Sequence, residues 1–309
     1  MDLERREFFK YLAYLGGLLG LPSTVSKAYG ETLKRIKEGE IRILILSGQS
    51  CSGCLLSSTY SDSPYFSDLV LMIKSFFTTT FSASDGEEYL REVFSIIERG
   101  NYILTLEGSV PGNPMFCEFG DYPYTEVLLK AVKNASFIVN MGTCASFGGI
   151  PAADGNPTGA MSVSEFLKRQ GLSVPYINVP GCPVRSDRIL STWLYIATFE
   201  KLPPLHKKLK IPKMFFGDLI HNNCERYQYF NQDVYASYPG DGRKCLLAIG
   251  CRGPITRGDC SYVRWNCGKN YCISAATPCI GCSNPNFPFK EPMYVSKKEI
   301  LKDIKIEEK

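Results

Sequence analysis

The chain has 309 residues, 44% of them hydrophobic and 21% charged, a composition that excludes a disordered or collagen-like protein and leaves room for two domains. Its formal net charge is only +4, with acidic and basic residues interleaved, so nothing indicates a nucleic-acid-binding protein. Thirteen cysteines and two histidines are present; an odd number of thiols cannot all form disulfides, and so few histidines argue against His-rich zinc or copper chemistry.

The first thirty residues read as an export signal. Arg5 and Arg6 precede an aromatic pair and an apolar stretch over residues 11–21, which is shorter than the ~20 residues that a transmembrane helix needs. Small residues at positions 28–30 suit cleavage, and the pattern predicts a twin-arginine signal peptide over residues 1–30 that exports the folded protein to the periplasm. The alternative is an amphipathic helix with a chance arginine pair. Because no second apolar run of membrane length follows, we expect no transmembrane anchor in the mature chain.

Four short apolar runs, rich in β-branched residues, come next, and each ends in a loop. They are residues 41–46, 102–106, 137–141 and 176–179. Continuous apolar runs of this length are typical of parallel strands covered on both faces. Helices are expected between them over residues 87–99 and 125–133, and a third begins at the capping box from Ser162 to Glu165. The alternation of strand and helix predicts a doubly wound α/β domain over residues 40–205.

Three of these four runs are followed by cysteines, and the fourth ends at Glu107. The cysteines are Cys51, Cys54, Cys144 and Cys182. In open α/β sheets, ligands bind outside the carboxyl ends of the strands, so we expect these thiols to converge on one four-thiolate site. The alternative, four buried cysteines acting as small hydrophobic residues, does not explain why each lies in a Gly- or Pro-bearing loop after a strand.

A proline-bearing link at residues 202–205 precedes a cysteine-rich domain that we expect over residues 206–295, with a charged tail over residues 296–309. Its candidate ligands are His221, Cys224, Cys245, Cys251, Cys260, Cys272, Cys279 and Cys282. Zinc ribbons show compact paired knuckles, whereas most of these ligands are single and widely scattered. Soft thiolates in groups of four, within Gly- and Pro-rich loops that offer backbone N–H groups, favour iron–sulfur clusters.

A series of short motifs runs through nearly the whole chain. They are Cys51-x-x-Cys54, Glu107-Gly-Ser-Val-Pro111, Gly142-Thr-Cys144-Ala-Ser-Phe-Gly-Gly149, Pro180-Gly-Cys182-Pro183, His221-x-x-Cys224, Gly250-Cys251-Arg-Gly-Pro254, Arg264-Trp265-Asn266 and Pro278-Cys279-Ile-Gly-Cys282. In this order they resemble the small subunit of the nickel–iron hydrogenases. The resemblance implies a flavodoxin-like domain followed by a mostly irregular and helical iron–sulfur domain. It also implies an oxidoreductase subunit that relays electrons from hydrogen oxidation to an external acceptor.

The resemblance assigns the candidate ligands to three clusters. A proximal [4Fe–4S] cluster matches Cys51, Cys54, Cys144 and Cys182. A distal [4Fe–4S] cluster matches His221, Cys224, Cys245 and Cys251. A medial cluster matches Cys260, Cys272, Cys279 and Cys282. Many relatives have proline at the position of Cys272 and a [3Fe–4S] medial cluster, so the fourth thiolate here predicts [4Fe–4S], with [3Fe–4S] as the alternative. Cys117 and Cys267 read as incidental thiols, and Cys267 is the alternative fourth medial ligand.

The sequence has neither an Arg-x-Cys-Gly-x-Cys segment nor an Asp-Pro-Cys-x-x-Cys-x-x-His tail, the two segments that hold nickel in these enzymes. The resemblance therefore implies a hydrogenase heterodimer in which the nickel–iron centre belongs to a large subunit and this chain has no catalytic residue. In the family, Glu107 lies near the proximal cluster and the subunit interface, so it is a candidate for a proton-relay or interface residue. The alternative is that its carboxylate simply accepts hydrogen bonds from backbone amides. The expected electron acceptor is a cytochrome b or a multihaem cytochrome c.

Three other readings of the chain stay open. A hydrogen-sensing module works in the cytoplasm, which the export signal argues against. A quinone-reductase subunit related to complex I has one cluster, which leaves His221 to Cys282 unexplained. A disulfide-stapled secreted binding protein is the third. Assays of iron and acid-labile sulfide distinguish it, because such a protein would fold without either.

Overall fold

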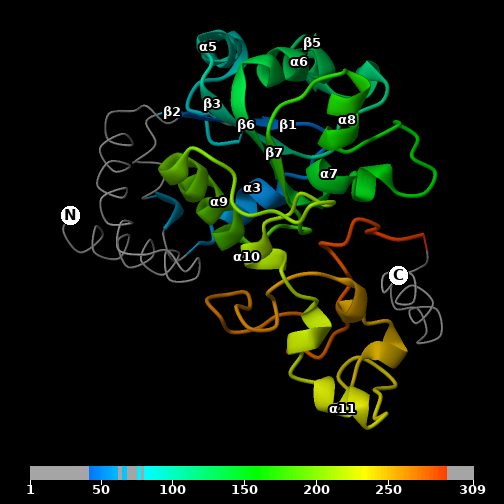
Figure 1. Cartoon of the computed structure of the whole chain (residues 1–309). Helices are drawn as coiled ribbons and strands as arrows, with labels where there is room; N and C mark the ends of the chain where they lie inside the picture. The colour runs from blue at the N-terminus through cyan, green and yellow to red at the C-terminus, as the bar shows by residue number, and fades with distance from the viewer. Residues whose placement is uncertain (1–41, 62–64, 68–74, 78–79, 291–309) are drawn as a thin grey trace. The chain divides into compact units, whose positions relative to one another are not determined.

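A computed structural model describes residues 42–61, 65–67, 75–77 and 80–290 of the chain (Figure 1). The chain divides into two compact units, Met1–Met214 and Phe215–Lys309. The predicted signal peptide and the charged tail lie outside the described residues. The fold is therefore known for the two parts of the chain that contain the candidate ligands.

The first unit is built on a five-stranded parallel sheet. Its strands are β1 (Arg42–Ser47), β2 (Ser75–Phe77), β3 (Tyr102–Glu107), β6 (Ala135–Met141) and β7 (Tyr176–Val179). They lie in the order β2-β1-β3-β6-β7, and every neighbouring pair is parallel. The α/β class predicted from the four apolar runs is confirmed. The chain leaves β1 toward one edge and returns to β3 on the other side, so the strand order reverses between β1 and β3, where sheets of the flavodoxin type bind their ligands.

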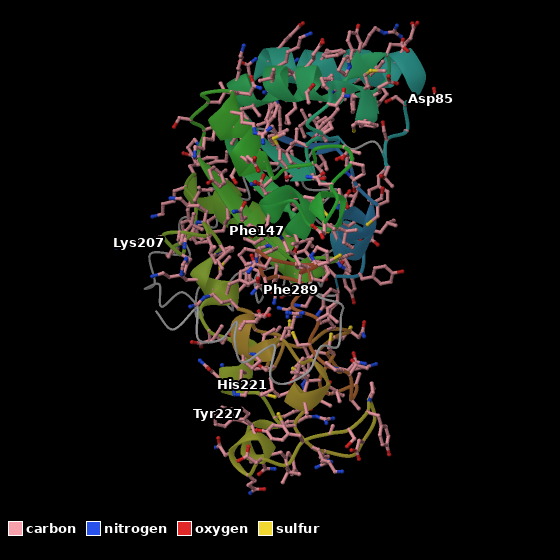
Figure 2. All side chains as sticks on the ribbon, turned by 90° about the vertical axis from the view of Figure 1, so that its right-hand side faces the viewer. Asp85, Phe147, Lys207, His221, Tyr227 and Phe289 are labelled. Atoms are coloured by element: carbon pink, nitrogen blue, oxygen red, sulfur yellow. The ribbon has the colours of Figure 1, made fainter. Side chains whose placement is uncertain are left out.

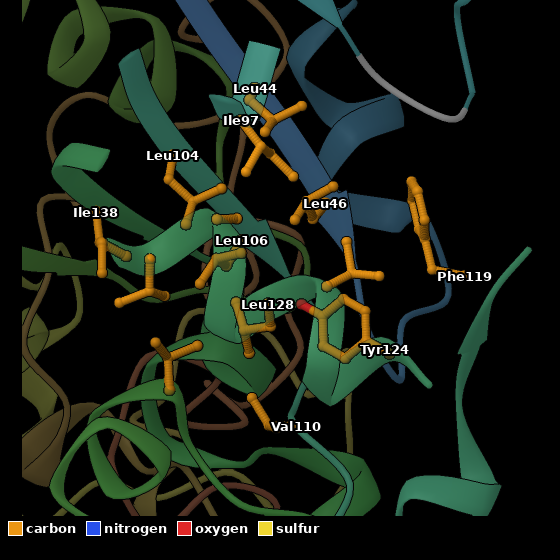
Figure 3. Close-up of a cluster of buried hydrophobic side chains, with 14 of the residues drawn as sticks. Leu44, Leu46, Ile97, Leu104, Leu106, Val110, Phe119, Tyr124, Leu128 and Ile138 are labelled. Carbon is orange, nitrogen blue, oxygen red and sulfur yellow. The ribbon is translucent and has the colours of Figure 1, made fainter. Parts of the chain in front are cut away.

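Side chains that alternate along the strands bury both faces of this sheet. One face carries Leu44, Leu46, Leu104, Leu106 and Ile138, which pack against α5 (Gly86–Arg99), α6 (Tyr124–Asn134) and α8 (Val163–Arg169) (Figure 3). On the other face, α9 (Ser186–Phe199) packs so closely that the indole Nε1 of Trp193 donates a hydrogen bond of 2.8 Å to Thr105 Oγ1. Figure 1 shows α5 and α6 on one side of the sheet and α9 on the other.

Local sequence explains where the predicted helices begin and end. The buried stripe of α5 consists of Tyr89, Val93, Ile96 and Ile97, and Gly100 ends the helix at φ 66°, a conformation that glycine adopts without strain. Ser162 caps α8, because its side chain accepts a hydrogen bond of 3.2 Å from the amide of Glu165. These two helices and α6 lie where the sequence predicts them.

Short elements complete the first unit and place its loops. The helices are α3 (Gly53–Ser58) and α7 (Gly142–Phe147), with the 3-10 turns η1 (Pro114–Phe116) and η2 (Ile150–Ala152), and β4 (Glu118–Phe119) pairs with β5 (Tyr122–Pro123). Helix α3 lies on the α9 side of the sheet, where Ser57 Oγ donates to the carbonyl of Val184 at 2.7 Å. Both helices follow strands at the carboxyl edge of the sheet: α3 begins after a short loop from β1, and α7 begins directly after β6.

The second unit consists of loops and short helices over its described residues, as the irregular iron–sulfur domain was expected to. Its elements are α10 (Lys213–Phe216, which begins just before the unit boundary), η3 (Ile220–Asn223), α11 (Tyr227–Asn231), η4 (Leu247–Ile249) and η5 (Gly253–Ile255). Its small apolar core includes two candidate ligands, Cys251 and Cys279, packed with Leu246 and Tyr271. Over the described ranges of both units, no helix combines the length and the apolar character that a membrane span requires.

Candidate metal centres

The carboxyl edge of the sheet gathers four thiols from three separate loops. Cys51 and Cys54 follow β1, Cys144 lies in α7 after β6, and Cys182 follows β7. Burial raises the pKa of Cys54 well above its usual range, and the charges of Glu107, Cys144 and Cys182 raise it further. Burial likewise raises the pKa of Cys182, and the charge of Cys51 adds to this. Cys51, Cys54 and Cys144 thus each lie within electrostatic range of Cys182, and we refer to these four residues as the proximal set.

Glycines allow two of these thiols to lie directly on the backbone of α7 and the loop after it. Gly142 has φ 87°, and a Cβ added there would overlap Cys54 Sγ. At Gly149, φ is 55° and an added Cβ would lie 2.8 Å from Cys144 Sγ, closer than a real Cβ contact allows. Neither position has room for a side chain, so bare backbone lies directly against Cys54 and Cys144.

The surroundings of the proximal set match what thiolates bound to iron need. The amide of Val184 donates to Cys54 Sγ at 3.5 Å, and the amide of Ile150 donates to Cys144. Burial still raises the pKa of Cys144 to about 11, and repulsion from Cys182 and Cys51 contributes. Deprotonating four thiols that lie this close together requires a compensating positive charge, which bound iron ions supply. The donor set therefore fits an iron–sulfur cluster.

Glu107 joins β3 to the loop that carries Cys54. Its side chain is 2% exposed, and its Oε1 accepts hydrogen bonds from the amides of Cys54 at 2.9 Å and Leu55 at 3.0 Å, in the first turn of α3. Burial raises the pKa of this carboxyl, and the hydrogen bonds to the two amides, with smaller contributions from Ser50 and Ser47, lower it. Oε2 makes no hydrogen bond of normal geometry with the described residues. The role that the structure supports is that of a backbone acceptor; the proton-relay and interface roles stay predictions.

In the second unit, four more candidate ligands line a single cavity. His221, Cys224, Cys245 and Cys251 face this cavity together with Arg226. The imidazole of His221 meets the ring of Phe230 edge-on, with 4.6 Å between the ring centroids, and lies 5.0 Å from Tyr227, the neighbour labelled with it in Figure 2. Burial lowers the pKa of His221, which favours the neutral imidazole that binds metals. These four ligands form the distal set.

Backbone amides and one buried cation surround the distal set. The amide of Arg226 donates to Cys224 Sγ at 3.4 Å, while the amides of Gly253 and Cys279 donate to Cys251. Burial raises the pKa of Cys251 to about 12, and Cys224 and Cys245 add to the effect through charge. The guanidinium of Arg226 donates to the carbonyls of Gly242 at 3.1 Å and Lys244 at 2.8 Å, so a positive charge is fixed in the cavity wall. Sequence reasoning missed Arg226, although it stands two residues after a ligand.

The last four candidate ligands, Cys260, Cys272, Cys279 and Cys282, form the medial set. The residue Cys272 is exposed on this unit. Desolvation of its thiol by the surrounding atoms nevertheless raises the pKa of Cys272, and the charge of Cys260 raises it further. Burial raises the pKa of Cys279, with Cys251, Cys282 and Cys272 as charged neighbours. Cys279 therefore interacts with both sets of this unit, and the medial and distal sets are adjacent.

The two remaining cysteines differ in their surroundings. Cys117 packs against the apolar core of the first unit, and burial raises the pKa of its thiol, which suits a small buried hydrophobic residue. Cys267 is exposed in a turn at φ 58°. Cys272, by contrast, interacts electrostatically with both Cys260 and Cys279.

No three of the His, Cys, Asp and Glu side chains in the described ranges lie close enough to hold one metal ion. A tetrahedral zinc site places four donors around a single ion, whereas the thiolates of a cluster bind different irons. None of the thirteen cysteines forms a disulfide. The case for clusters therefore rests on the chemistry of the donors and on their convergence.

Known proteins resemble the chain over almost its whole length. Residues 216–295 match the family model for the C-terminal part of the NiFe/NiFeSe hydrogenase small subunit, and residues 51–196 match that of the NADH ubiquinone oxidoreductase 20 Kd subunit. The uptake hydrogenase small subunit of Afipia carboxidovorans is 36% identical over 96% of this chain and 82% of that protein. The periplasmic [NiFeSe] hydrogenase small subunit of Desulfomicrobium baculatum is 33% identical over 96% of this chain and 100% of that protein. The structure of an H2-activated [NiFeSe] hydrogenase from Dm. baculatum superposes with a TM-score of 0.78 at 33% identity, covering 83% of this chain and 99% of that one.

Proposed function

Since the chain belongs to the family of NiFe and NiFeSe hydrogenase small subunits, and is thus a hydrogenase's electron-transfer subunit, we propose that it carries electrons through three iron–sulfur clusters. The observation that most strongly supports this proposal is the convergence of four thiols from three loops at the carboxyl edge of the sheet. When bound, the clusters supply one-electron redox steps; the chain holds them and sets their surroundings. Electrons would pass from the proximal set to the medial and distal sets, and then to an external acceptor.

We assign a [4Fe–4S] cluster to each set, with [3Fe–4S] as the alternative for the medial one. Support for the distal assignment comes from the common cavity of its three cysteines and one histidine. Support for Cys272 as the fourth medial ligand comes from its interactions with Cys260 and Cys279. The same twelve residues hold all the iron of this chain under the proposal.

The chain's own groups prepare these sites for electron transfer. Amide N–H groups that donate to Cys54, Cys224 and Cys251 stabilise the negative charge that reduction adds, which raises a cluster's potential. The amide of Cys279, a medial ligand, donates a hydrogen bond to Cys251, a distal ligand, so the two sets are in direct contact. This contact favours the second unit as the path by which electrons leave.

A large subunit with the nickel–iron centre is the partner we propose. Large apolar side chains are exposed in the segments that follow β1, β3 and β6, and such surfaces mark protein interfaces. They are Leu56, Tyr60, Met115, Phe116 and Ile150, with exposed fractions from 46% to 84%. Because these segments also carry or flank the proximal ligands, the large subunit would dock beside the proximal set. A cytochrome b or a multihaem cytochrome c remains the proposed acceptor.

Acid-labile sulfide provides the test of the proposed function, because only iron–sulfur clusters contain it. The purified heterodimer is expected to hold about twelve sulfides per small subunit, four for each cluster. A folded chain that contains no sulfide, with its thirteen cysteines present as thiols or in disulfides, would contradict the proposal and favour the secreted binding protein. A sulfide content of about four would favour the single-cluster relative of complex I, whose family model matches residues 51–196.

Export by the twin-arginine route gives a second prediction. A periplasmic relative supports a periplasmic location for this chain. Replacing Arg5 and Arg6 with lysine keeps the charge but removes the guanidinium pair, so we expect the folded, cluster-bearing subunit to accumulate in the cytoplasm. Cell fractionation with an antibody to the chain is the measurement.

The control for the export experiment is a second exchange between lysine and arginine, made outside the signal. Lys207 and Lys208 are adjacent cations of the first unit, and replacing both with arginine keeps the charge of the chain and leaves residues 1–30 intact. We expect this double variant to be exported normally. Unchanged export of the Arg5/Arg6 variant would refute the route and would revive the cytoplasmic hydrogen sensor.

A further inference from the structure

Tyr271 lies between the two ligand sets of the second unit. It directly precedes Cys272 of the medial set, and its side chain is only 5% exposed. Its ring belongs to the small apolar core that contains Cys251 of the distal set and Cys279 of the medial set. Neither set uses this tyrosine as a ligand, so a residue with a polar hydroxyl stands between two metal sites without binding either.

Hydrogen bonds fix the backbone of Tyr271 firmly. Ser274 Oγ accepts from the amide of Tyr271 at 2.8 Å and donates to its carbonyl at 3.0 Å, and the amide of Ala275 donates to the same carbonyl at 2.9 Å. The carbonyl of Cys272 accepts from both the amide and the Oγ1 of Thr277, at 3.0 and 2.9 Å. A tight turn therefore holds the ring and the Cys272 backbone in a fixed relation.

The hydroxyl of Tyr271 is buried beside a distal ligand. It makes no hydrogen bond of normal geometry with the described residues, and its electrostatic neighbour is Cys224, which packs against the same apolar core. A buried hydroxyl without an acceptor is destabilising, so such groups persist where a further acceptor is supplied. Sulfur atoms of a bound cluster, or Cys224 Sγ once it binds iron, are acceptors of the right kind at this place.

We propose that Tyr271 is a positioning residue whose hydroxyl donates a hydrogen bond to sulfur at the distal site and raises the distal potential relative to the medial one. The inference rests on the proposed function, because it needs a distal cluster. A donor to sulfur stabilises the extra negative charge of the reduced state, so the electron is held more strongly at the distal site. The fixed turn at Cys272 keeps the donor in place while electrons move from the medial to the distal set.

Tyr271→Phe tests the inference in the purified heterodimer, because it removes the hydroxyl and keeps the ring. Redox titration followed by electron paramagnetic resonance gives the potential of each cluster, and the 14N coupling of His221 identifies the distal one. At a fixed potential, we expect the ratio of reduced to oxidised distal cluster to fall about tenfold, equivalent to about 59 mV for a one-electron couple. Tyr238→Phe, at a tyrosine that is 61% exposed in the same unit, is the matched control and is expected to cause no shift.

A second measurement covers the case in which Tyr271→Phe does not assemble. In the unmodified heterodimer, the reduced distal cluster should show one more exchangeable coupled proton in 2H2O than the three amides of Arg226, Gly253 and Cys279 supply. With the distal cluster present, an unchanged potential in Tyr271→Phe, or no exchangeable proton beyond those of the three amides in the unmodified protein, overturns the inference but leaves the proposed function intact. A heterodimer without a distal cluster overturns both, and sulfide content separates the two failures.

Discussion

Gly142→Ala is expected to abolish the proximal cluster, while Gly155→Ala leaves it in place. The two glycines have nearly the same φ, 87° and 89°. Strain from an L-residue in a positive-φ conformation, roughly 1–2 kcal/mol, is therefore similar at both positions. Only at Gly142 does the added Cβ meet another atom, because it overlaps Cys54 Sγ, whereas nothing lies within 4 Å of a Cβ at Gly155. The difference between the variants isolates the steric effect on one ligand.

The measurement is the sulfide content of the purified chain together with its thermal stability. Gly142→Ala should lose about one third of the sulfide, that of one cluster among three, and Gly155→Ala should lose none. Equal losses in both variants would show that backbone strain, not ligand displacement, is responsible. Full sulfide content in Gly142→Ala would contradict the assignment of Cys54 to the proximal set. Hydrogen-dependent reduction of a dye should fall with the cluster, since electrons would no longer reach the second unit.

Periodicity in the sequence predicted the strands that matter for the site but not every element. Strands β1, β3, β6 and β7 follow apolar runs that burial on both faces makes continuous. Strand β2 is only three residues long, too short for a recognisable run. Helix α9 was missed because its residues from Arg188 to Ala197 are all buried, so it shows no polar face and no helical period.

The sequence predicted which thiols could serve as ligands, because strand ends in a parallel sheet meet at one edge. It could not predict what surrounds them. The approach of Cys54 to Gly142 joins loops 88 residues apart, and it depends on how α3 and α7 pack. Arg226 and Tyr271 stand near ligands in the chain, yet an arginine or tyrosine at such a place more often faces solvent. Only tertiary structure shows that one lines the distal cavity and that the other is buried between two ligand sets.

Cys272→Ala is expected to convert the medial cluster from four irons to three. The variant removes the thiolate that distinguishes this chain from relatives with proline at the same position, and three thiolates remain from Cys260, Cys279 and Cys282. An iron without its protein thiolate is readily lost, and the four sulfides stay. Since a three-iron cluster with fewer thiolates carries less negative charge, the medial potential should rise above its neighbours and trap electrons. Hydrogen oxidation with a fast external acceptor should slow at least about tenfold.

Electron paramagnetic resonance of the air-oxidised heterodimer decides the matter. The unmodified protein should lack a three-iron signal, and Cys272→Ala should show about one spin per small subunit. Cys267→Ala is the matched control, because Cys267 is also an exposed thiol of the second unit and stands five residues earlier in the chain. If Cys267→Ala produced the three-iron signal and Cys272→Ala did not, Cys267 would be the fourth medial ligand. A strong signal in the unmodified protein would instead mean that the thiol of Cys272 stays off the cluster, in spite of its interaction with Cys260. The sulfide content, equal in both variants, separates the loss of one iron from the loss of the whole cluster.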